Sequence, residues 1–464
     1  MVFSSLIFLG LFLPVTLLLY NLSKNITYKN IILLIASLFF YAWGEPVLIA
    51  VMLMSAFVGY ISAYGVSKWR GTKLGTVSLI FALFVDIGAL GLYKYAGFFV
   101  SNINALLGTS IEFSGFALPL GISFYTFQIL SYVIDVYRGN VPVQKSFYKF
   151  LLYVSMFPQL VAGPIVRYID IEKQINDRKI TAKGFEYGVI RFTQGVFKKV
   201  VLANCAGSIV TNLMGGDMAT LSALGAWFGI IMYAFQIFFD FSAYSDMAIG
   251  LGSFFGFKFK ENFDYPYMSK SITEFWRRWH MSLGSFFRDY VYIPLGGNRK
   301  HQLVNITIVW FLTGFWHGAS WNFIFWGVYY GAWLIIEKKL IFKFIDRIPA
   351  FIRLIYSNII VLGGWMLFYF TDLRQLKTYL LCLFGQNENA NNLMVRIQAE
   401  SHIWLILLMF VCSTPLVKIT AKKLREKCGV LYAIALPVAV TVIMVCCFAL
   451  LVKQSYNPFL YFRF

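Results

Sequence analysis

Long apolar runs recur along almost the whole chain, and they limit its possible folds more than any other feature of the sequence. An α-helix rises about 1.5 Å per residue, so roughly 20 apolar residues cross the hydrocarbon core of a bilayer. Hydrophobic residues make up 59% of the chain and charged residues 13%, a balance too apolar for a soluble domain of 464 residues. Ten runs approach the spanning length, at residues 3–20, 30–42, 47–65, 77–100, 115–134, 193–212, 221–240, 353–371, 402–417 and 429–452. We therefore predict an all-α polytopic membrane protein with about 10–12 transmembrane helices.

Shorter or interrupted apolar runs lie at residues 149–166, 303–316 and 320–336. We expect them to form hairpins or re-entrant pieces rather than full spans. No low-complexity linker or internal repeat divides the chain, so we predict a single integral membrane domain over residues 1–464. The first run has no basic residue before it and no small-residue cleavage site, which favours a retained span over a signal peptide.

Basic residues gather on one set of loops, and this asymmetry predicts an orientation. Of the 40 Lys and Arg, 34 lie in the segments 21–30, 66–75, 138–149, 167–199, 257–301, 337–353 and 418–427. If the N-terminus is extracytoplasmic and the spans alternate, these segments share the cytoplasmic side, as the positive-inside rule requires. The net charge of +19 is then explained mostly by topology and by anionic membrane lipids. A few of these residues are candidates to dock a phosphate-bearing donor or an acidic carrier, and we expect no nucleic-acid partner.

His317 is the most informative single residue, because the apolar run from Leu303 to Ile336 holds no other charged side chain and no second histidine. Basic residues flank both ends of this run, so we predict that 303–336 is a hairpin with its turn within 313–320. A titratable group at membrane depth is costly and by default marks a functional site. The alternative is a histidine that bonds inside a helix bundle for packing.

A second histidine lies in the basic and aromatic segment 257–301, which we interpret as a cytoplasmic-side interfacial element. Ser271 or Thr273 is placed to cap a helix that continues to about residue 290. Its aromatic face contains Trp276, Trp279, His280, Leu283, Phe286 and Phe287 at helical spacing, and Arg277, Arg278 and Arg288 fall largely elsewhere. From this pattern His280 is equally consistent with a structural and with a catalytic role. The turn residues of 292–299 end the helix.

Two acidic residues, Asp240 and Asp246, occur near the predicted cytoplasmic end of a span. Either side chain can orient a histidine or pair with an arginine from 277–288, and an arginine partner is the commoner outcome. The six cysteines show no metal-ligand spacing and no disulfide framework, so we expect free thiols and no metal site.

At these motifs the chain resembles the membrane-bound O-acyltransferase family. The similarity is to the bacterial branch that contains alginate O-acetyltransferases and the D-alanyl transfer proteins of teichoic acid synthesis. It rests on six short sequences, Met-Val-Phe-Ser-Ser at 1–5, Tyr-Ala-Trp-Gly-Glu-Pro at 41–46, Asp-Phe-Ser-Ala-Tyr-Ser-Asp at 240–246, Phe-Trp-Arg-Arg-Trp-His-Met-Ser at 275–282, Tyr-Ile-Pro-Leu-Gly-Gly-Asn-Arg at 292–299 and Phe-Trp-His-Gly at 315–318. Both histidine-bearing motifs are highly specific.

The resemblance implies a ring of helices around a central tunnel, with His317 as the catalytic histidine and His280 as the second family histidine. It implies transfer of an acyl group, with acetyl expected first, from acetyl-CoA or an acyl carrier protein in the cytoplasm. The acceptor would be a hydroxyl of an extracytoplasmic polysaccharide. An extracytoplasmic partner protein that completes the transfer, and a location in the bacterial cell membrane, are also implied.

The residues are consistent with this chemistry. Thioester acyl transfer needs a base for the attacking hydroxyl and some polarisation of the carbonyl, and a buried neutral imidazole is a suitable base. We expect His317 to deprotonate the acceptor and His280 to position the thioester or polarise its carbonyl. Candidate substrate-binding residues are Asp240, Asp246, Trp316, Asn322, Arg277 and Arg278. The alternatives are a lipid or polysaccharide transporter without acyl chemistry, a membrane glycosyltransferase and a non-catalytic scaffold.

Overall fold

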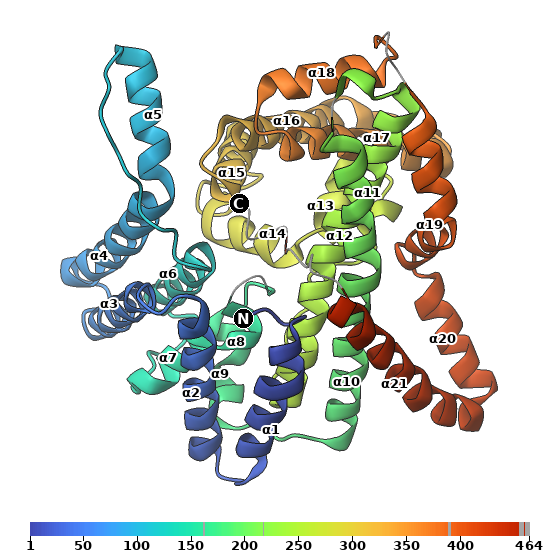
Figure 1. The fold of residues 1–464 in the computed structure, drawn as a ribbon. Coiled ribbons are helices and arrows are strands. Elements are labelled where there is room, and N and C mark those ends of the chain that lie inside the picture. Colours follow the sequence, from blue (N-terminus) through green and yellow to red (C-terminus); the bar gives the residue numbers. More distant parts are fainter. Residues whose placement is uncertain (161–162, 217, 388–390, 454–458, 460–464) are drawn as a thin grey trace. The chain divides into compact units, whose positions relative to one another are not determined.

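The computed structural model describes residues 1–160, 163–216, 218–387, 391–453 and 459. These residues form helices joined by loops, and their β-structure is limited to an isolated bridge between Leu221 and Asn391. The predicted all-α class is confirmed (Figure 1). The chain divides into two compact units, the first comprising residues 1–192 and 244–261, the second residues 193–243 and 262–464. A single integral domain stays a prediction.

The first unit is built from apolar helices whose ends are set by local capping. Asn25 accepts hydrogen bonds from the backbone N–H groups of Thr27 and Tyr28 and so starts α2, and Thr72 caps α4 in the same way. The helices are η1 Phe8–Phe12, α1 Leu13–Asn21, α2 Ile26–Gly44, α3 Ile49–Lys68, α4 Lys73–Leu90, η2 Gly91–Tyr95, α5 Ala96–Leu107, α6 Ile122–Arg138, α7 Phe147–Ser155, α8 Phe157–Leu160, α9 Tyr168–Asn176 and α10 Ala182–Phe197. The last of these, and α12, cross the boundary between the units.

A half-buried arginine, Arg178, connects distant segments of the first unit. The guanidinium of Arg178 donates to the hydroxyl of Tyr20 at 3.0 Å, to the backbone oxygen of Phe255 at 2.9 Å and to Oδ1 of Asn30 at 2.7 Å. Its planar face lies 4.2 Å from the centroid of the Phe257 ring. These contacts join segments that are far apart in the sequence, and they satisfy most of the donors of a charge that would be costly to bury alone.

The second unit contains both histidine-bearing motifs. Its helices are η3 Lys198–Ala203, α11 Asn204–Met214, η4 Met218–Thr220, α12 Ala223–Phe254, η5 Pro266–Met268, α13 Ile272–Arg278, α14 Met281–Phe287, η6 Arg288–Tyr292, α15 Gln302–His317, α16 Trp321–Lys339, η7 Ile341–Lys343, η8 Ile345–Arg347, α17 Ala350–Tyr369, α18 Leu373–Leu383, α19 Leu393–Cys412, α20 Leu416–Lys427 and α21 Gly429–Lys453. The aromatic core of this unit includes Phe275, Trp279, Trp326, Tyr330 and Trp365.

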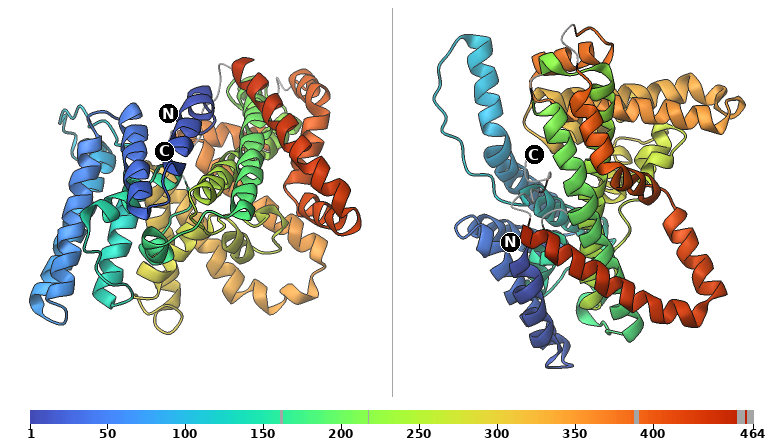
Figure 2. Two further views of the ribbon diagram at one scale, coloured as in Figure 1. Left: turned by 90° about the horizontal axis from the view of Figure 1, so that it is seen from below. Right: turned by 45° about the vertical axis from the view of Figure 1, so that its right-hand side comes forward.

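The predicted hairpin is present, and its two arms run side by side (Figures 1 and 2). The first arm, α15, ends at His317, and the second, α16, begins at Trp321. Gly314 and Gly327 face each other so closely that a Cβ on Gly314 would lie 3.0 Å from the Cα of Gly327. Small residues thus let the backbones of the two arms touch just below the turn.

Seven helices in the described part of the chain are long and apolar enough to cross a membrane, at Ile26–Gly44, Ile49–Lys68, Lys73–Leu107, Ala223–Phe254, Ala350–Tyr369, Leu393–Cys412 and Gly429–Lys453. This is consistent with a polytopic membrane protein, although seven is fewer than the ten runs predicted. The run at 3–20 forms the shorter helix Phe8–Asn21, and the run at 115–134 becomes helical only from Ile122. The run at 193–212 lies in helices interrupted by the π-helical turn η3, which includes Lys198 and Lys199.

Candidate functional site

The helix predicted from residue 271 to about residue 290 is broken in two, and this part of the prediction is wrong. Ser271 does cap the first piece, because its hydroxyl accepts a 3.0 Å hydrogen bond from the Glu274 N–H. However, α13 ends at Arg278 and α14 begins at Met281. Between them His280 takes the left-handed conformation, with φ +44° and ψ +53°, which is uncommon outside glycine.

The break is made by Asn262, which lies in the loop before α13. The backbone N–H of Met281 donates to the Asn262 carbonyl at 3.0 Å, and the N–H of Ser282 donates to Asn262 Oδ1 at 3.0 Å. These two donors are the first N–H groups of α14, which have no partner within their own helix. The asparagine therefore caps α14 from a distance, and the cap holds the turn at His280.

His280 is fully enclosed at this turn, with a relative exposure of 2%. Its Nδ1 lies 3.2 Å from Asn262 Oδ1 and 3.4 Å from the Ser282 hydroxyl. The rings of Phe241, Phe263 and Trp316 surround it at centroid distances of 4.6, 6.5 and 6.2 Å. Burial among these groups lowers the pKa of His280 from its ordinary 6.5 to about 3. The imidazole is therefore neutral at physiological pH.

His317 has a different environment at the tip of the hairpin. It is the last residue of α15, it is half-buried, and its ring lies edge-on to Trp326 at 4.9 Å and to Phe368 at 5.3 Å. The neighbouring Trp316 contacts both histidines, with ring centroids 4.9 Å from His317 and 6.2 Å from His280. The structure thus joins the two histidine-bearing motifs through one indole ring.

A buried carboxylate connects the hairpin to the helix that precedes His280. Glu337, near the end of α16, has no exposed surface, and its two oxygens accept from the N–H groups of Ile272 and Thr273 at 2.5 and 2.8 Å. They also accept from the Thr273 hydroxyl at 2.7 Å and from the Tyr356 hydroxyl at 3.2 Å. The carboxylate therefore satisfies the first N–H groups of α13 and fixes that helix against α16. Neither Asn262 nor Glu337 was singled out in the sequence, because a lone polar residue beside apolar segments gives no periodic signal.

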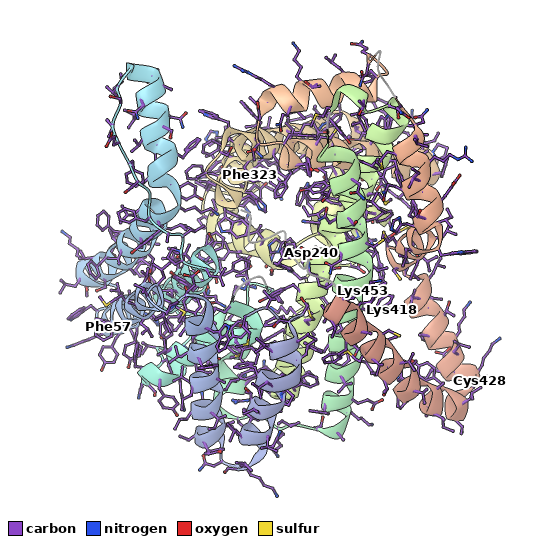
Figure 3. All side chains as sticks on the ribbon, viewed as in Figure 1. Phe57, Asp240, Phe323, Lys418, Cys428 and Lys453 are labelled. Carbon is purple, nitrogen blue, oxygen red and sulfur yellow. The ribbon has the colours of Figure 1, made fainter. Side chains whose placement is uncertain are left out.

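Asp240 and Asp246 form ion pairs with basic residues outside 277–288, where an arginine partner was expected. Asp240 pairs with Lys199 at 2.6 Å, and both side chains are almost completely buried (Asp240 is labelled in Figure 3). Asp246, in the first unit, pairs with Arg191 at 2.7 Å, and Arg191 also contacts Glu261. The flanking carboxylates raise the pKa of Arg191 further above its ordinary value despite its burial. Both basic partners precede α12 in the chain and come from η3 and α10.

The other candidate residues differ in how they are held. Arg277 is exposed, whereas Arg278 pairs with Glu274 at 2.8 Å and with Asp264 at 3.7 Å. Asn322 is fully buried at the start of α16, and its amide donates to the backbone oxygens of Leu367 and Phe368 at 3.2 and 3.5 Å. These two hydrogen bonds hold the end of α17 beside the His317 turn.

Within the described residues no three His, Cys, Asp or Glu side chains gather as a metal site would require.

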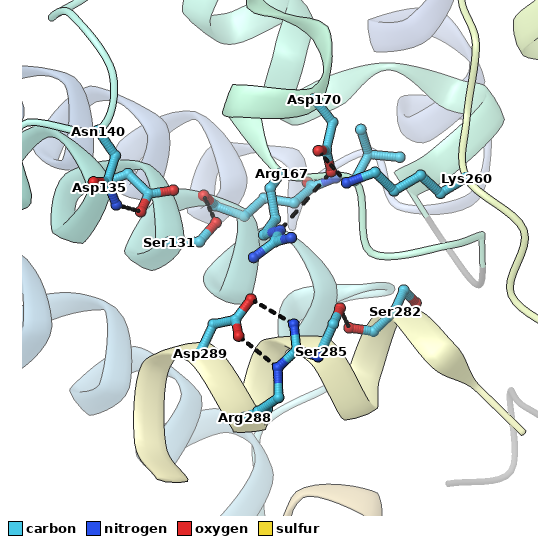
Figure 4. A network of polar contacts seen from close by, with 12 residues as sticks. Ser131, Asp135, Asn140, Arg167, Asp170, Lys260, Ser282, Ser285, Arg288 and Asp289 are labelled. Carbon is cyan, nitrogen blue, oxygen red and sulfur yellow. Dashed lines mark hydrogen bonds and ion pairs between the residues drawn. The ribbon is translucent and has the colours of Figure 1, made fainter. Parts of the chain in front are cut away.

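Several of the basic residues expected on the cytoplasmic side are held in ion pairs (Figure 4). In the first unit, Asp170 lies 2.5 Å from Lys260 and 3.8 Å from Arg167. In the second unit, Arg288 pairs with its neighbour Asp289 at 2.7 Å. Part of the positive charge is thus neutralised within the protein, which leaves fewer residues for docking a donor.

The helical fold, the apolar spans and the two histidines joined by Trp316 define a polytopic membrane protein with a polar site built into aromatic surroundings. The sequence model of the membrane-bound O-acyltransferase family matches residues 141–373, which is half of the chain and includes both histidines. The chain belongs to this family, as its motifs indicated, and it is an O-acyltransferase.

Curated relatives match over much or all of the chain. The probable alginate O-acetylase of Azotobacter vinelandii is 37% identical over an alignment of 507 positions, which covers 100% of both proteins. The peptidoglycan O-acetyltransferase of Helicobacter pylori is 34% identical and covers 83% of this chain and 80% of its own. The teichoic acid D-alanyltransferase of Streptococcus thermophilus is 33% identical over 52% of this chain and 62% of its own.

Proposed function

We propose that this O-acyltransferase moves an acetyl group from a cytoplasmic thioester to a hydroxyl of an extracytoplasmic polysaccharide. The relatives named for alginate and peptidoglycan O-acetylation support acetyl as the group and a polysaccharide as the acceptor. The thioester is acetyl-CoA or an acetylated carrier protein. The N-terminus lies on the extracytoplasmic side of the bacterial cell membrane, and an extracytoplasmic partner protein completes the transfer.

The observation that carries the proposal is the position of His317. It is a titratable ring at the tip of a hairpin inside an apolar segment, and it is half-open while the rings of Trp326 and Phe368 cover part of it. A neutral imidazole that is open on one side can accept a proton from a hydroxyl. This combination of reach and basicity is what a general base for a hydroxyl requires.

His317 is the only proton carrier that this reaction needs. A ring nitrogen of His317 takes the proton of the attacking hydroxyl as its oxygen bonds to the thioester carbonyl carbon. The tetrahedral species then expels the thiolate as the C–S bond breaks, and the imidazolium returns its proton to the departing sulfur. The products are an acetyl ester and a free thiol. A tunnel past His317 brings the thioester and the hydroxyl together from opposite sides of the membrane.

The test compares the acetyl ester content of cell-surface polymers in wild type and in His317→Ala at equal membrane abundance. We expect the ester to be lost in the variant. His402→Ala is the matched control, because His402 is another histidine on an apolar helix, α19, where its Nδ1 lies 3.0 Å from the Gln398 backbone oxygen. An unchanged ester level in His317→Ala would remove His317 as the catalytic residue. Equal loss in both variants would indicate a general defect of the protein.

A further inference from the structure

The buried ring of His280 has one nitrogen engaged and one nitrogen open. Nδ1 faces Asn262 Oδ1 and the Ser282 hydroxyl, whereas Nε2 is buried and has no hydrogen-bond partner among the described residues. An unpaired polar atom at 2% exposure costs free energy, and such atoms in a folded protein call for an explanation. The direction of the open nitrogen's hydrogen bond depends on which ring nitrogen carries the proton.

We propose that Asn262 is a positioning residue that holds the proton of His280 on Nδ1, so that Nε2 presents a lone pair to an N–H or O–H group of the bound substrate. This inference rests on the proposed function for the identity of the substrate, but the tautomer itself does not depend on it.

The orientation of the Asn262 amide is fixed by a backbone group. The Ser282 N–H can only donate, and the atom 3.0 Å from it must therefore be the amide oxygen. With the oxygen placed there, the same atom lies 3.2 Å from His280 Nδ1. An amide oxygen can only accept, so a hydrogen bond at this distance requires a proton on Nδ1.

The Ser282 hydroxyl leads to the same assignment. Its oxygen is 2.8 Å from Asn262 Oδ1 and 3.4 Å from His280 Nδ1, and its single proton is best used in the shorter contact. A bare Nδ1 would then face the lone pairs of two oxygen atoms. If the hydroxyl proton turned toward Nδ1 instead, Nδ1 would still oppose Asn262 Oδ1 as one acceptor against another. Only the Nδ1–H tautomer makes these contacts attractive.

The assignment changes the role expected for His280. Polarising a thioester carbonyl requires a donor, and a neutral ring with its proton on Nδ1 has none at Nε2. Protonating both nitrogens is opposed by the complete burial of the ring among Phe241, Phe263 and Trp316. Nε2 therefore accepts a hydrogen bond. The donors that the reaction offers are the amide N–H groups in the pantetheine arm of the thioester and the hydroxyl of the acceptor.

The tautomer can be measured directly in the intact protein. The chain has four histidines, so ¹⁵N-histidine spectra of the protein in lipid bilayers contain few signals, and His280→Gln identifies the one from His280. Wild type is expected to show a protonated Nδ1 and a bare Nε2 at neutral pH. Asn262→Asp keeps an acceptor oxygen at this position and should keep the proton on Nδ1. Asn262→Ala removes the acceptor and should shift the proton toward Nε2, with a roughly ten- to hundredfold loss of kcat.

Asn305→Ala is the matched control, because Asn305 is an equally buried asparagine whose amide donates to the Gly297 and Lys300 backbone oxygens. It should leave the His280 signals unchanged. A rise in KM for the thioester alone in Asn262→Ala would assign the bond to the pantetheine amide, and a rise for the polysaccharide alone would assign it to the hydroxyl.

A wild-type spectrum with the proton on Nε2 would overturn the proposal even if Asn262→Ala fails to fold. So would an Asn262→Ala protein whose tautomer is unchanged. If the expected tautomer is found but no preparation transfers acetyl groups, the proposed function fails and the assignment of the proton stands.

Discussion

His280 and His317 both contact Trp316, yet one ring is enclosed and the other is partly open to solvent. His280 is fully buried beside Asn262 and Ser282, and one of its nitrogens is engaged by them. His317 is half-buried at the end of a helix, and the rings of Trp326 and Phe368 pack against it. A base must reach its substrate and gain a proton, whereas a ring that orients a substrate must be fixed. The half-open ring of His317 is therefore consistent with the role of the base, and the fixed ring of His280 with the role of orienting a substrate.

The largest expected effect is a loss of kcat in His317→Ala. Removing a general base lowers kcat by roughly 10³-fold, and His280→Ala should cost less because it leaves the base in place. Acetyl transfer from a labelled thioester by purified protein in liposomes measures both variants under one set of conditions. If His280→Ala lowered kcat more than His317→Ala while both variants remained folded, the two roles would have to be exchanged.

The next prediction concerns stability, and it tests the link that Glu337 makes between α16 and α13. Glu337→Ala leaves the N–H groups of Ile272 and Thr273 and two hydroxyls without their buried acceptor, and we expect it to lower the free energy of unfolding by about 3 kcal/mol. Glu337→Gln should lose less, because an amide oxygen still accepts. Thermal unfolding in detergent measures both.

The control for this change is Glu400→Ala. Glu400 pairs with Arg396 at 2.7 Å, but both side chains are largely exposed, so the loss should stay below about 1 kcal/mol. A Glu337→Ala protein as stable as this control would mean that α13 is held by its apolar contacts alone.

The burial of His280 also predicts a pH dependence. In the unfolded chain its imidazole takes up a proton below its ordinary pKa of 6.5, whereas in the folded protein it does so only below about 3. Acid therefore favours the unfolded state, and the free energy of unfolding should fall by about 2 kcal/mol between pH 7 and pH 5 from this group. His280→Gln should remove that part of the slope. Parallel slopes in the two proteins would show that His280 titrates normally when folded.

The smallest effect is expected for Trp316, whose ring contacts both His280 and His317. Trp316→Phe keeps an aromatic ring between them but removes part of its contact area, which corresponds to about a threefold loss of kcat. The same liposome assay measures it. A loss as large as that of His317→Ala would show that the indole N–H takes part in the reaction.

Much of the fold followed from local patterns. The hairpin and its turn within 313–320 were predictable because apolar arms, flanking charges and small residues all lie close together in the sequence. The Ser271 cap was predictable for the same reason. The break at His280 was not, since helical periodicity continues through it and the asparagine that makes it lies 18 residues earlier.

The partners of the buried acids could not be predicted for the same physical reason. Lys199 is 41 residues from Asp240, and Arg191 is 55 residues from Asp246. Charge attraction has no sequence period, so the nearby arginines of 277–288 were the natural choice, whereas the ion pairs found in the structure use Lys199 and Arg191. Which residues bind the thioester or the polysaccharide stays a prediction.

The close approach of Gly314 and Gly327 has a mechanical consequence. Because the two backbones already touch there, the arms of the hairpin cannot move closer, and their interlocked faces resist sliding past each other. The α15–α16 hairpin is therefore a rigid element that carries His317 at its end. We therefore expect a substrate to approach His317 from the open side of its ring, without any movement of the two arms.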